Sequence, residues 1–350
     1  MDILNNQFIC YDNIRASVEV IEGDIETYGV NYGDILFQRS SETLEDVGQA
    51  NVYLDRKPAV FGGFVIRGKS KGNYHPVFFR YLLASPTARK RIIVKGAGAQ
   101  HFNIGQDGLS RVCLNIPSIQ EQEKIAKLFE CVDTRIATQN KIIEDLKKLK
   151  SAISKQVFAQ EPNGWSRLDT LFSKGKAGGT PTSTNKEYYN GEIPFLSIND
   201  ITKQGRYVRY TENHLSQSGL ENSSAWVVPK YSLIMSMYAS VGLVTINEIP
   251  ITTSQAMFAM QLKDKDLLDY LYYYLSYFKY RHIHKYLETG TQSNINADIV
   301  RGIMIPTYGH SRNMEIASTL QGIDVKIDNE LSVLKLFNRQ KNYLLSQMFI

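Results

Sequence analysis

Two short loops rich in amide side chains give this sequence its clearest chemistry for molecular recognition. Each combines amide groups with an imidazole or a hydroxyl: Gln100, His101 and Asn103 in the first loop, and Gln292, Ser293 and Asn294 in the second. A glutamine or asparagine amide can pair with both the donor and the acceptor on the major-groove edge of adenine. The same residues are common in ordinary turns, for which Gly98 and Gly290 would supply the bend.

Other polar residues follow two strands that we expect to be equivalent, or lie in a glycine-rich segment. These further candidates for nucleic-acid contact are Arg39, Ser40 and Ser41, then Tyr238 and Ser240, then Gly179 and Thr180. Basic residues also form clusters that could neutralise phosphates, and the candidates among them are Lys57, Arg67, Lys69, Lys203 and Arg206. A basic cluster is as often a solvated surface, so spacing alone leaves both interpretations open.

The composition permits nucleic acid as a partner without requiring it, because the formal net charge is only +5. The three cysteines, Cys10, Cys113 and Cys131, stand far apart. This spacing predicts neither a disulfide framework nor a zinc knuckle, and it suits a reducing cytoplasm. We expect no signal peptide, and the most apolar stretch, residues 267–280, is too short to span a membrane.

Motifs that would indicate catalysis are missing or weak. Residues 175–177 read Gly-Lys-Ala, without the serine or threonine of a phosphate-binding loop. The sequence holds no Asn/Asp-Pro-Pro-aromatic motif of an adenine methyltransferase, and its histidines form no metal-binding set. The triplets at 55–57 and 324–326 match the end of a nuclease motif, but such triplets arise by chance in any charged chain. We therefore predict no catalytic residue and no metal site.

The elements that must position these residues include two long helices related by an internal repeat. Apolar residues recur in steps of four and three, as in a coiled-coil seam, at 125–157 and again 191 positions later at 316–348. The seams are interrupted by polar residues at equivalent seats: Gln139 and Lys150 in the first, and Glu330 and Lys341 in the second. Identical interruptions indicate a duplication in which each half ends in a helix.

We expect the two helices to pair in antiparallel orientation. In our predicted register Lys150 lies opposite Glu330, and Gln139 lies opposite Lys341, so that each lysine meets an acceptor. A parallel arrangement would bring the two lysines together, which is repulsive.

Each helix follows a module of mixed helices and short strands. Ser118 and Glu121 have the spacing of a capping box, and Ser311 is expected to cap the second helix. The chain then divides into a module at 1–117, a helix at 118–160, a module at 161–309 and a helix at 310–350. In the second module we expect strands at 193–198, 226–228 and 232–237 and a helix at 265–287.

The first module is short at its N-terminal side. Ile35 aligns with Leu233, and on that alignment about 35 residues at the start of the second module, including residues 178–181, have no counterpart in the first.

Together these features resemble the specificity (S) subunit of type I restriction–modification systems. The resemblance rests on the order of the parts and on four segments: Ile116-Pro-Ser-Ile-Gln-Glu-Gln-Glu-Lys-Ile-Ala126, Gly178-Gly-Thr-Pro-Thr182, Ile193-Pro-Phe-Leu196 and Gly290-Thr-Gln-Ser-Asn-Ile295. The entry to the second helix, residues 305–315, departs from the family pattern because it lacks the Glu-Gln pair of the first.

The resemblance implies an α+β fold, with two mixed α/β target recognition domains separated by a long antiparallel two-helix coiled coil, arranged as a pseudo-two-fold repeat. It implies a non-catalytic chain that reads a bipartite target in double-stranded DNA. The implied partners are two methyltransferase (M) subunits and two restriction/translocase (R) subunits. S-adenosylmethionine, ATP and Mg would be bound by those partners, and no cofactor by this chain.

Three alternatives stay open at this point. The chain could be a stand-alone DNA nuclease or methyltransferase with a helical dimerisation arm. It could be a scaffold that binds only protein, or a truncated or recombining specificity subunit.

Overall fold

The computed structural model describes residues 2–98, 100–287 and 294–349. The chain forms two compact units: unit 1 comprises Met1–Ile142 and Glu330–Ile350, and unit 2 comprises Ile143–Asn329. Each unit therefore holds one mixed α/β module and one part of each long helix. Within the described residues, no helix combines the length and the apolar character needed to cross a membrane.

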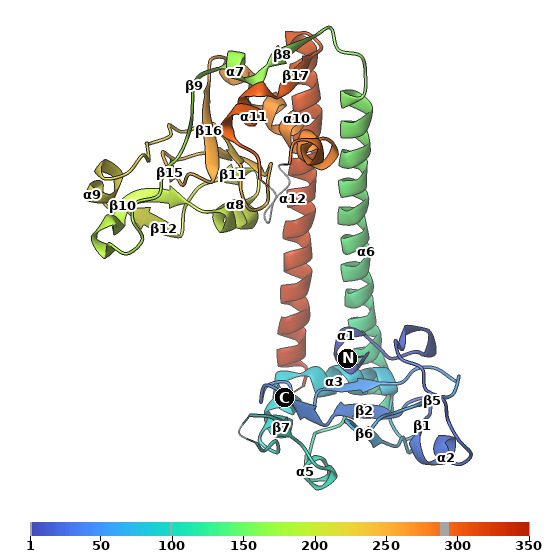
Figure 1. Ribbon diagram of the computed structural model, residues 1–350. Coiled ribbons are helices and arrows are strands. Elements are labelled where there is room, and N and C mark those ends of the chain that lie inside the picture. Colours follow the sequence, from blue (N-terminus) through green and yellow to red (C-terminus); the bar gives the residue numbers. More distant parts are fainter. Residues whose placement is uncertain (1, 99, 288–293, 350) are drawn as a thin grey trace. The chain divides into compact units, whose positions relative to one another are not determined.

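The long helices are α6 (Ile119–Phe158) and α12 (His310–Gln347), drawn in green and red in Figure 1. The predicted capping box starts α6, because Glu121 N donates to Ser118 Oγ at 3.4 Å and Ser118 N donates to the Glu121 carboxylate at 3.2 Å. The predicted cap of α12 is wrong, since Ser311 lies inside the helix. The chain turns at Gly309 instead, with φ +89°, and the Gly309 carbonyl accepts from Asn313 N at 2.9 Å.

The two helices are antiparallel, as predicted. In unit 1, Asp133 contacts Lys341 and Gln139 contacts Glu330, so positions rise along α6 as they fall along α12. The predicted register is wrong. Lys150 binds Asp324 at 2.5 Å and not Glu330, and Lys341 binds Asp133 at 2.6 Å and not Gln139. The displacement is close to one seven-residue repeat. Most apolar seats still face apolar seats after such a shift, but each of the four polar seats then faces an apolar one.

Unit 2 is built around a five-stranded sheet of order β11-β14-β13-β16-β9. Its strands are β9 (Phe172–Ala177), β11 (Tyr207–Val208), β13 (Leu233–Ser236), β14 (Val244–Asn247) and β16 (Met257–Leu262). All four residues of β13 are buried, because it lies in the middle of the sheet and helix α10 (Leu268–Arg281) belongs to the same apolar core.

Smaller elements complete unit 2. A three-stranded sheet contains β12 (Asn213–Leu215), β10 (Tyr189–Leu196) and β15 (Thr252–Thr253), and a two-stranded sheet joins β17 (Met304–Thr307) to β8 (Gly164–Arg167). The short helices are α7 (Leu168–Leu171), α8 (Ile198–Gln204), α9 (Gln217–Glu221) and α11 (Ala297–Gly302).

Unit 1 contains a three-stranded sheet of order β4-β2-β6. Its strands are β2 (Ile35–Gln38), β4 (Ala50–Val52) and β6 (Val65–Gly68), and two small sheets pair β1 (Gly29–Val30) with β5 (Ala59–Val60) and β3 (Ser40–Ser41) with β7 (Phe102–Asn103). The helices are α1 (Asp2–Asn5), α2 (Asp24–Tyr28), α3 (Pro76–Ala84), α4 (Pro86–Ile93) and α5 (Gln106–Ser110).

The predicted alignment of Ile35 with Leu233 is confirmed by strand pairing. Ile35 begins β2 and pairs with both neighbouring strands of its sheet, and Leu233 does the same at the start of β13. Unit 2 continues its sheet beyond β16 with β9, whereas the described sheet of unit 1 ends at β6.

Three expected elements of unit 2 have different boundaries. Residues 226–228 form only an isolated bridge between Val228 and Ile251. Strand β10 ends at Leu196 because Ser197 and Asp200 form a capping box that starts α8. The expected helix at 265–287 is interrupted, since α10 ends at Arg281 and a separate 3-10 turn follows at Ile283–Lys285.

Candidate nucleic-acid interface

In both units the loop that closes the module is bonded to the end of the central strand. Ile104 N donates to Arg39 O at 2.9 Å in unit 1, and Ile295 N donates to Met237 O at 3.0 Å in unit 2. These pairs occupy equivalent positions in the repeat. The structure therefore brings together, in each unit, two segments that the sequence singled out separately. We call each such junction a reading edge.

The reading edge of unit 1 is formed by β3 and β7. Ser40 Oγ donates to the Asn103 side chain, and Ala97 and Asn103 exchange two backbone hydrogen bonds of 2.9 and 2.8 Å. Gly98 has φ +146°, and a Cβ there would lie 2.0 Å from His101 O, so this tight loop requires glycine. Ser41 lies beside Ser40 on β3 and pairs with Phe102.

Four predicted residues of this edge expose their side chains to solvent: Arg39, Gln100, His101 and Asn103. They supply a guanidinium, two amides and an imidazole. Such groups can donate to and accept from base edges in the major groove.

The reading edge of unit 2 is the turn after β13. Tyr238 is 42% exposed, and Ala239 and Ser240 have positive φ angles of 38° and 53°. The Ser240 carbonyl accepts from Ser236 Oγ at 2.7 Å, which holds this uncommon backbone conformation. Asn294 is half-buried beside the bonded Ile295. Gln292 and Ser293 lie outside the described residues.

The glycine-rich segment of unit 2 runs against two other backbone segments. Gly179 N donates to Thr253 O at 2.9 Å, and a Cβ on Gly179 would lie 2.3 Å from Ser224 Oγ. Thr180 is exposed and hydrogen-bonded to Gln255. The glycines are thus explained by close packing, and Thr180 is the side chain that reaches solvent.

Some of the predicted basic residues form hydrogen bonds or ion pairs with other residues of the fold, and others do not. Lys57 pairs with Asp12 at 3.0 Å, and Arg67 donates to the Gly29 carbonyl. Among these candidates only Lys69 is exposed with no described hydrogen bond or ion pair.

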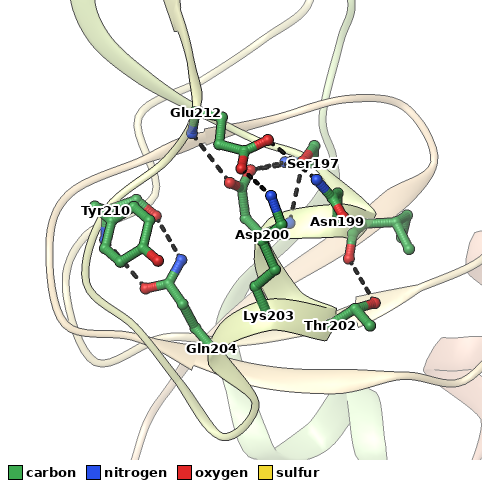
Figure 2. A network of polar contacts seen from close by, with 9 residues as sticks. Ser197, Asn199, Asp200, Thr202, Lys203, Gln204, Tyr210 and Glu212 are labelled. Atoms are coloured by element: carbon green, nitrogen blue, oxygen red, sulfur yellow. Dashed lines mark hydrogen bonds and ion pairs between the residues drawn. The ribbon is translucent and has the colours of Figure 1, made fainter. Parts of the chain in front are cut away.

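Lys203 belongs to a polar network around the start of α8, shown in Figure 2. Its ammonium pairs with Glu212, whose carboxylate also accepts from Asn199 at 3.0 Å. The hydrogen bond from Lys203 is the main reason that the pKa of Glu212 is lowered. Asp200 accepts from Glu212 N at 3.0 Å and caps α8 through Ser197. Lys203 therefore fixes the loop at 210–212, and its charge is largely compensated.

Arg206 is packed inside unit 2, with its side chain only 10% exposed. It pairs with Asp269 and donates to Tyr273 OH at 2.6 Å. Burial alone would lower the pKa of Arg206, but Tyr273 and Asp269 outweigh burial and raise it. This environment favours a structural role over contact with phosphate.

A pair of equivalent sites, which we did not predict, joins each module to the long helices. In unit 1, Tyr81 OH donates to Asp133 at 2.7 Å, and Lys341 pairs with the same carboxylate at 2.6 Å. In unit 2, Tyr273 OH donates to Asp324 at 2.8 Å, and Lys150 pairs with it at 2.5 Å. We call these the Tyr–Asp–Lys anchors.

Burial, followed by the adjacent aspartate, raises the pKa of both anchor tyrosines, so they stay protonated donors. The sequence carried a signal for the anchors that we did not use. Asp133 and Asp324 lie at the same place in the repeat, immediately beside the seam.

Comparisons with known proteins agree with this architecture. The family model described as "Type I restriction modification DNA specificity domain" matches residues 1–148 and 162–334. The MjaIX specificity subunit of Methanocaldococcus jannaschii is 27% identical over 44% of this chain, and the matched part is 36% of that relative's length. The putative MjaX specificity subunit of the same organism is 25% identical over 89% of this chain and 76% of the relative.

Solved structures support the fold. The S subunit from M. genitalium has a TM-score of 0.53 and 15% identity, covering 93% of this chain and 85% of the other. A chain from a study of type I R-M complex assembly has a TM-score of 0.63 and 16% identity, covering 91% and 81%. Because the family model matches most of its length, the chain belongs to the family of type I restriction–modification DNA specificity proteins.

Proposed function

We propose that this chain is the DNA specificity subunit of a type I restriction–modification complex, located in the cytoplasm, and that it has no catalysis of its own. The observation that carries the proposal is the pair of reading edges, which are built by the same backbone hydrogen bond in both units. Two equivalent edges suit a target with two halves, each read by one module in the major groove.

The long helices would set the distance between the two half-sites. Helices α6 and α12 contain 40 and 38 residues without interruption, and they contact each other in both units. At about 1.5 Å per residue, such helices are about 60 Å long. A spacer of this kind explains why a specificity protein would retain a duplicated helix.

The catalytic functions would belong to partner subunits. We propose two methyltransferase (M) subunits that bring S-adenosylmethionine, and two restriction/translocase (R) subunits that bring ATP and Mg. The helix entry at residues 116–126 is a candidate contact with an M subunit, and Ile116 and Ile119 are 51% and 46% exposed there.

Reconstitution with labelled S-adenosylmethionine tests the proposal. The pure chain should transfer no methyl groups, whereas the chain with its cognate M subunit should methylate adenines at a two-part target. Methyl transfer by the rigorously purified chain alone would refute it.

Two substitutions then separate base reading from phosphate contact. Gln100→Ala should lower methylation at the native site by about 5- to 100-fold, the cost of one lost bidentate base contact, and should relax one base position. Lys69→Gln should weaken binding to all sequences alike and reduce its dependence on salt. Equal effects of Gln100→Ala on target and unrelated DNA would show that this loop does not read bases.

A further inference from the structure

Unit 2 contains a small cavity between α6 and α10 that the proposed function does not use. Its volume is about 240 Å³. Helix α6 contributes Lys147, Ser151 and Ser154 to its walls, and α10 contributes Ser276, Tyr280 and Arg281. Lys150, Tyr273 and Tyr277 complete the lining, so three cations, several hydroxyl groups and three aromatic rings face one space, and no carboxylate lines it.

Two of the three cations that line this cavity have no ion-pair partner within the described residues. Lys147 and Arg281 are exposed, and neither has an ion-pair partner among the carboxylates in the described part of the chain. Lys150, which also lines the cavity, differs because Asp324 compensates its charge. A cation near the end of α10 complements the helix dipole, which accounts for Arg281 but not for Lys147 in the middle of α6.

The surroundings of Arg281 carry further positive charge. Burial, and then the charges of Lys285, His284 and Arg281, lower the pKa of His282. Positive side chains thus gather at the C-terminal end of α10, where they offset the partial negative charge of the helix terminus.

The repeat provides an internal comparison, because the equivalent positions of unit 1 lack part of this chemistry. Lys147 and Ser154 correspond to Asn338 and Leu345 on α12. When Tyr273 is aligned with Tyr81 through the anchors, Tyr280 corresponds to Ala88. The same alignment pairs Arg281 with Arg89, so the repeat shows that the fold can be built without Lys147 and Tyr280.

The exposed ring of Tyr280 adds a second recognition element. Tyr280 is 79% exposed, and Lys279 lies over its ring at 5.4 Å. Aromatic rings at the rim of a cationic groove are suited to stacking against nucleobases. The cavity is smaller than the roughly 300–1,000 Å³ typical of sites for drug-sized ligands, so it suits a single phosphate with one ring at its mouth.

We propose that this cavity of unit 2 binds the phosphate of a nucleotide, with Lys147 and Arg281 holding the phosphate and Tyr280 stacking on the base. The nucleotide can be a free mononucleotide or one unit of a nucleic-acid strand, because both carry the same chemistry.

Binding measurements with the full chain test the site, using inorganic phosphate, AMP and a short single-stranded DNA as separate probes. The variant Lys147→Gln/Arg281→Gln should weaken AMP binding by about tenfold or more, since two charge-assisted contacts are lost. The single variants Lys147→Gln and Lys148→Gln each remove one positive charge, and only Lys147→Gln should weaken AMP binding, because Lys148 lies outside the cavity. Tyr280→Ala should weaken AMP binding several-fold and leave phosphate binding within about twofold, as expected for a lost base stack.

The three probes distinguish a free nucleotide from a nucleic-acid strand as the ligand. Loss of AMP binding in the double variant identifies a free-nucleotide site. Loss confined to the single-stranded DNA supports the same site, with a nucleic-acid strand as the source of the nucleotide. The proposal is overturned if the double variant binds all three probes as the unaltered chain does, or if Lys148→Gln has the same effect as Lys147→Gln. Circular dichroism spectra and melting temperatures should match throughout, because the substituted residues are exposed.

Discussion

Replacing Asp324 by asparagine should destabilise unit 2 through its Tyr–Asp–Lys anchor. Lys150 and Asp324 are 28% and 22% exposed, so their pair is mostly, but not fully, removed from water. Removing one partner of a fully buried pair costs about 3–5 kcal/mol, whereas an exposed pair contributes about 1 kcal/mol or less. We therefore expect the free energy of unfolding to fall by about 2 kcal/mol. Asparagine still accepts a hydrogen bond from Tyr273, which limits the loss.

The equivalent change in unit 1 should cost more. Asp133 is only 8% exposed, and it accepts from Gln7 as well as from Tyr81. Asp133→Asn should therefore cost about 3 kcal/mol. Lys148→Gln is the matched control, because Lys148 and Glu144 are 68% and 64% exposed, and it should be the least destabilising of the three changes.

Urea unfolding followed by circular dichroism measures these differences, and a double-mutant cycle isolates the pair. Asp324→Asn combined with Lys150→Met should cost about 1–2 kcal/mol less than the sum of the single changes. The reasoning fails if this coupling is below about 0.3 kcal/mol, or if Asp324→Asn is no more harmful than Lys148→Gln.

Three further predictions concern the modules, the spacer and pH. Exchanging residues 161–309 for the corresponding module of a relative should change one half of the methylated target, and methylome sequencing that shows both halves altered would contradict independent reading. Inserting one heptad in each helix, at the layer of Gln139 and Glu330, should lengthen the unread gap between the two half-sites by about three base pairs, since seven residues add about 10 Å. An active variant with an unchanged gap would exclude the spacer role. Burial raises the pKa of Tyr53 and Tyr272 to about 12, above the value near 10 in an unfolded chain. These tyrosines should therefore leave the free energy of unfolding unchanged below about pH 10 and lower it between pH 10 and 12. Urea titrations that show no decline across that interval would contradict this prediction.

The repeat explains why much of the fold could be predicted from sequence. A seam in steps of four and three requires a long paired helix, and the spacing of Ser118 and Glu121 fixes where α6 begins. The alignment of Ile35 with Leu233 succeeded because a central strand is apolar on both faces in either copy. The limits of shorter elements were less predictable, since single side-chain caps such as Ser197 decide them.

The candidate interface could be predicted only in part, because its residues depend on contacts that are distant in sequence. The closing loops and the turns after the central strands were each identified from residue types, but their junction depends on long-range backbone hydrogen bonds. Composition also could not separate Lys69, which is exposed, from Arg206, which Asp269 holds inside the unit. Whether these residues contact DNA stays a prediction.

The register of the helices follows from the residues beside the seam. The seam alone would favour the predicted register, because a shift of one seven-residue repeat sets each polar seat opposite an apolar one, as with Lys341 opposite Val132. In the predicted register the lysines would face Glu330 and Gln139, leaving the carboxylates of Asp133 and Asp324 without a cation from the opposite helix. An uncompensated carboxylate that is only 8% exposed, as Asp133 is, would be costly. The anchors satisfy each aspartate with one lysine and one tyrosine, so they select the register and, through α3 and α10, attach each module to the helices at a defined position.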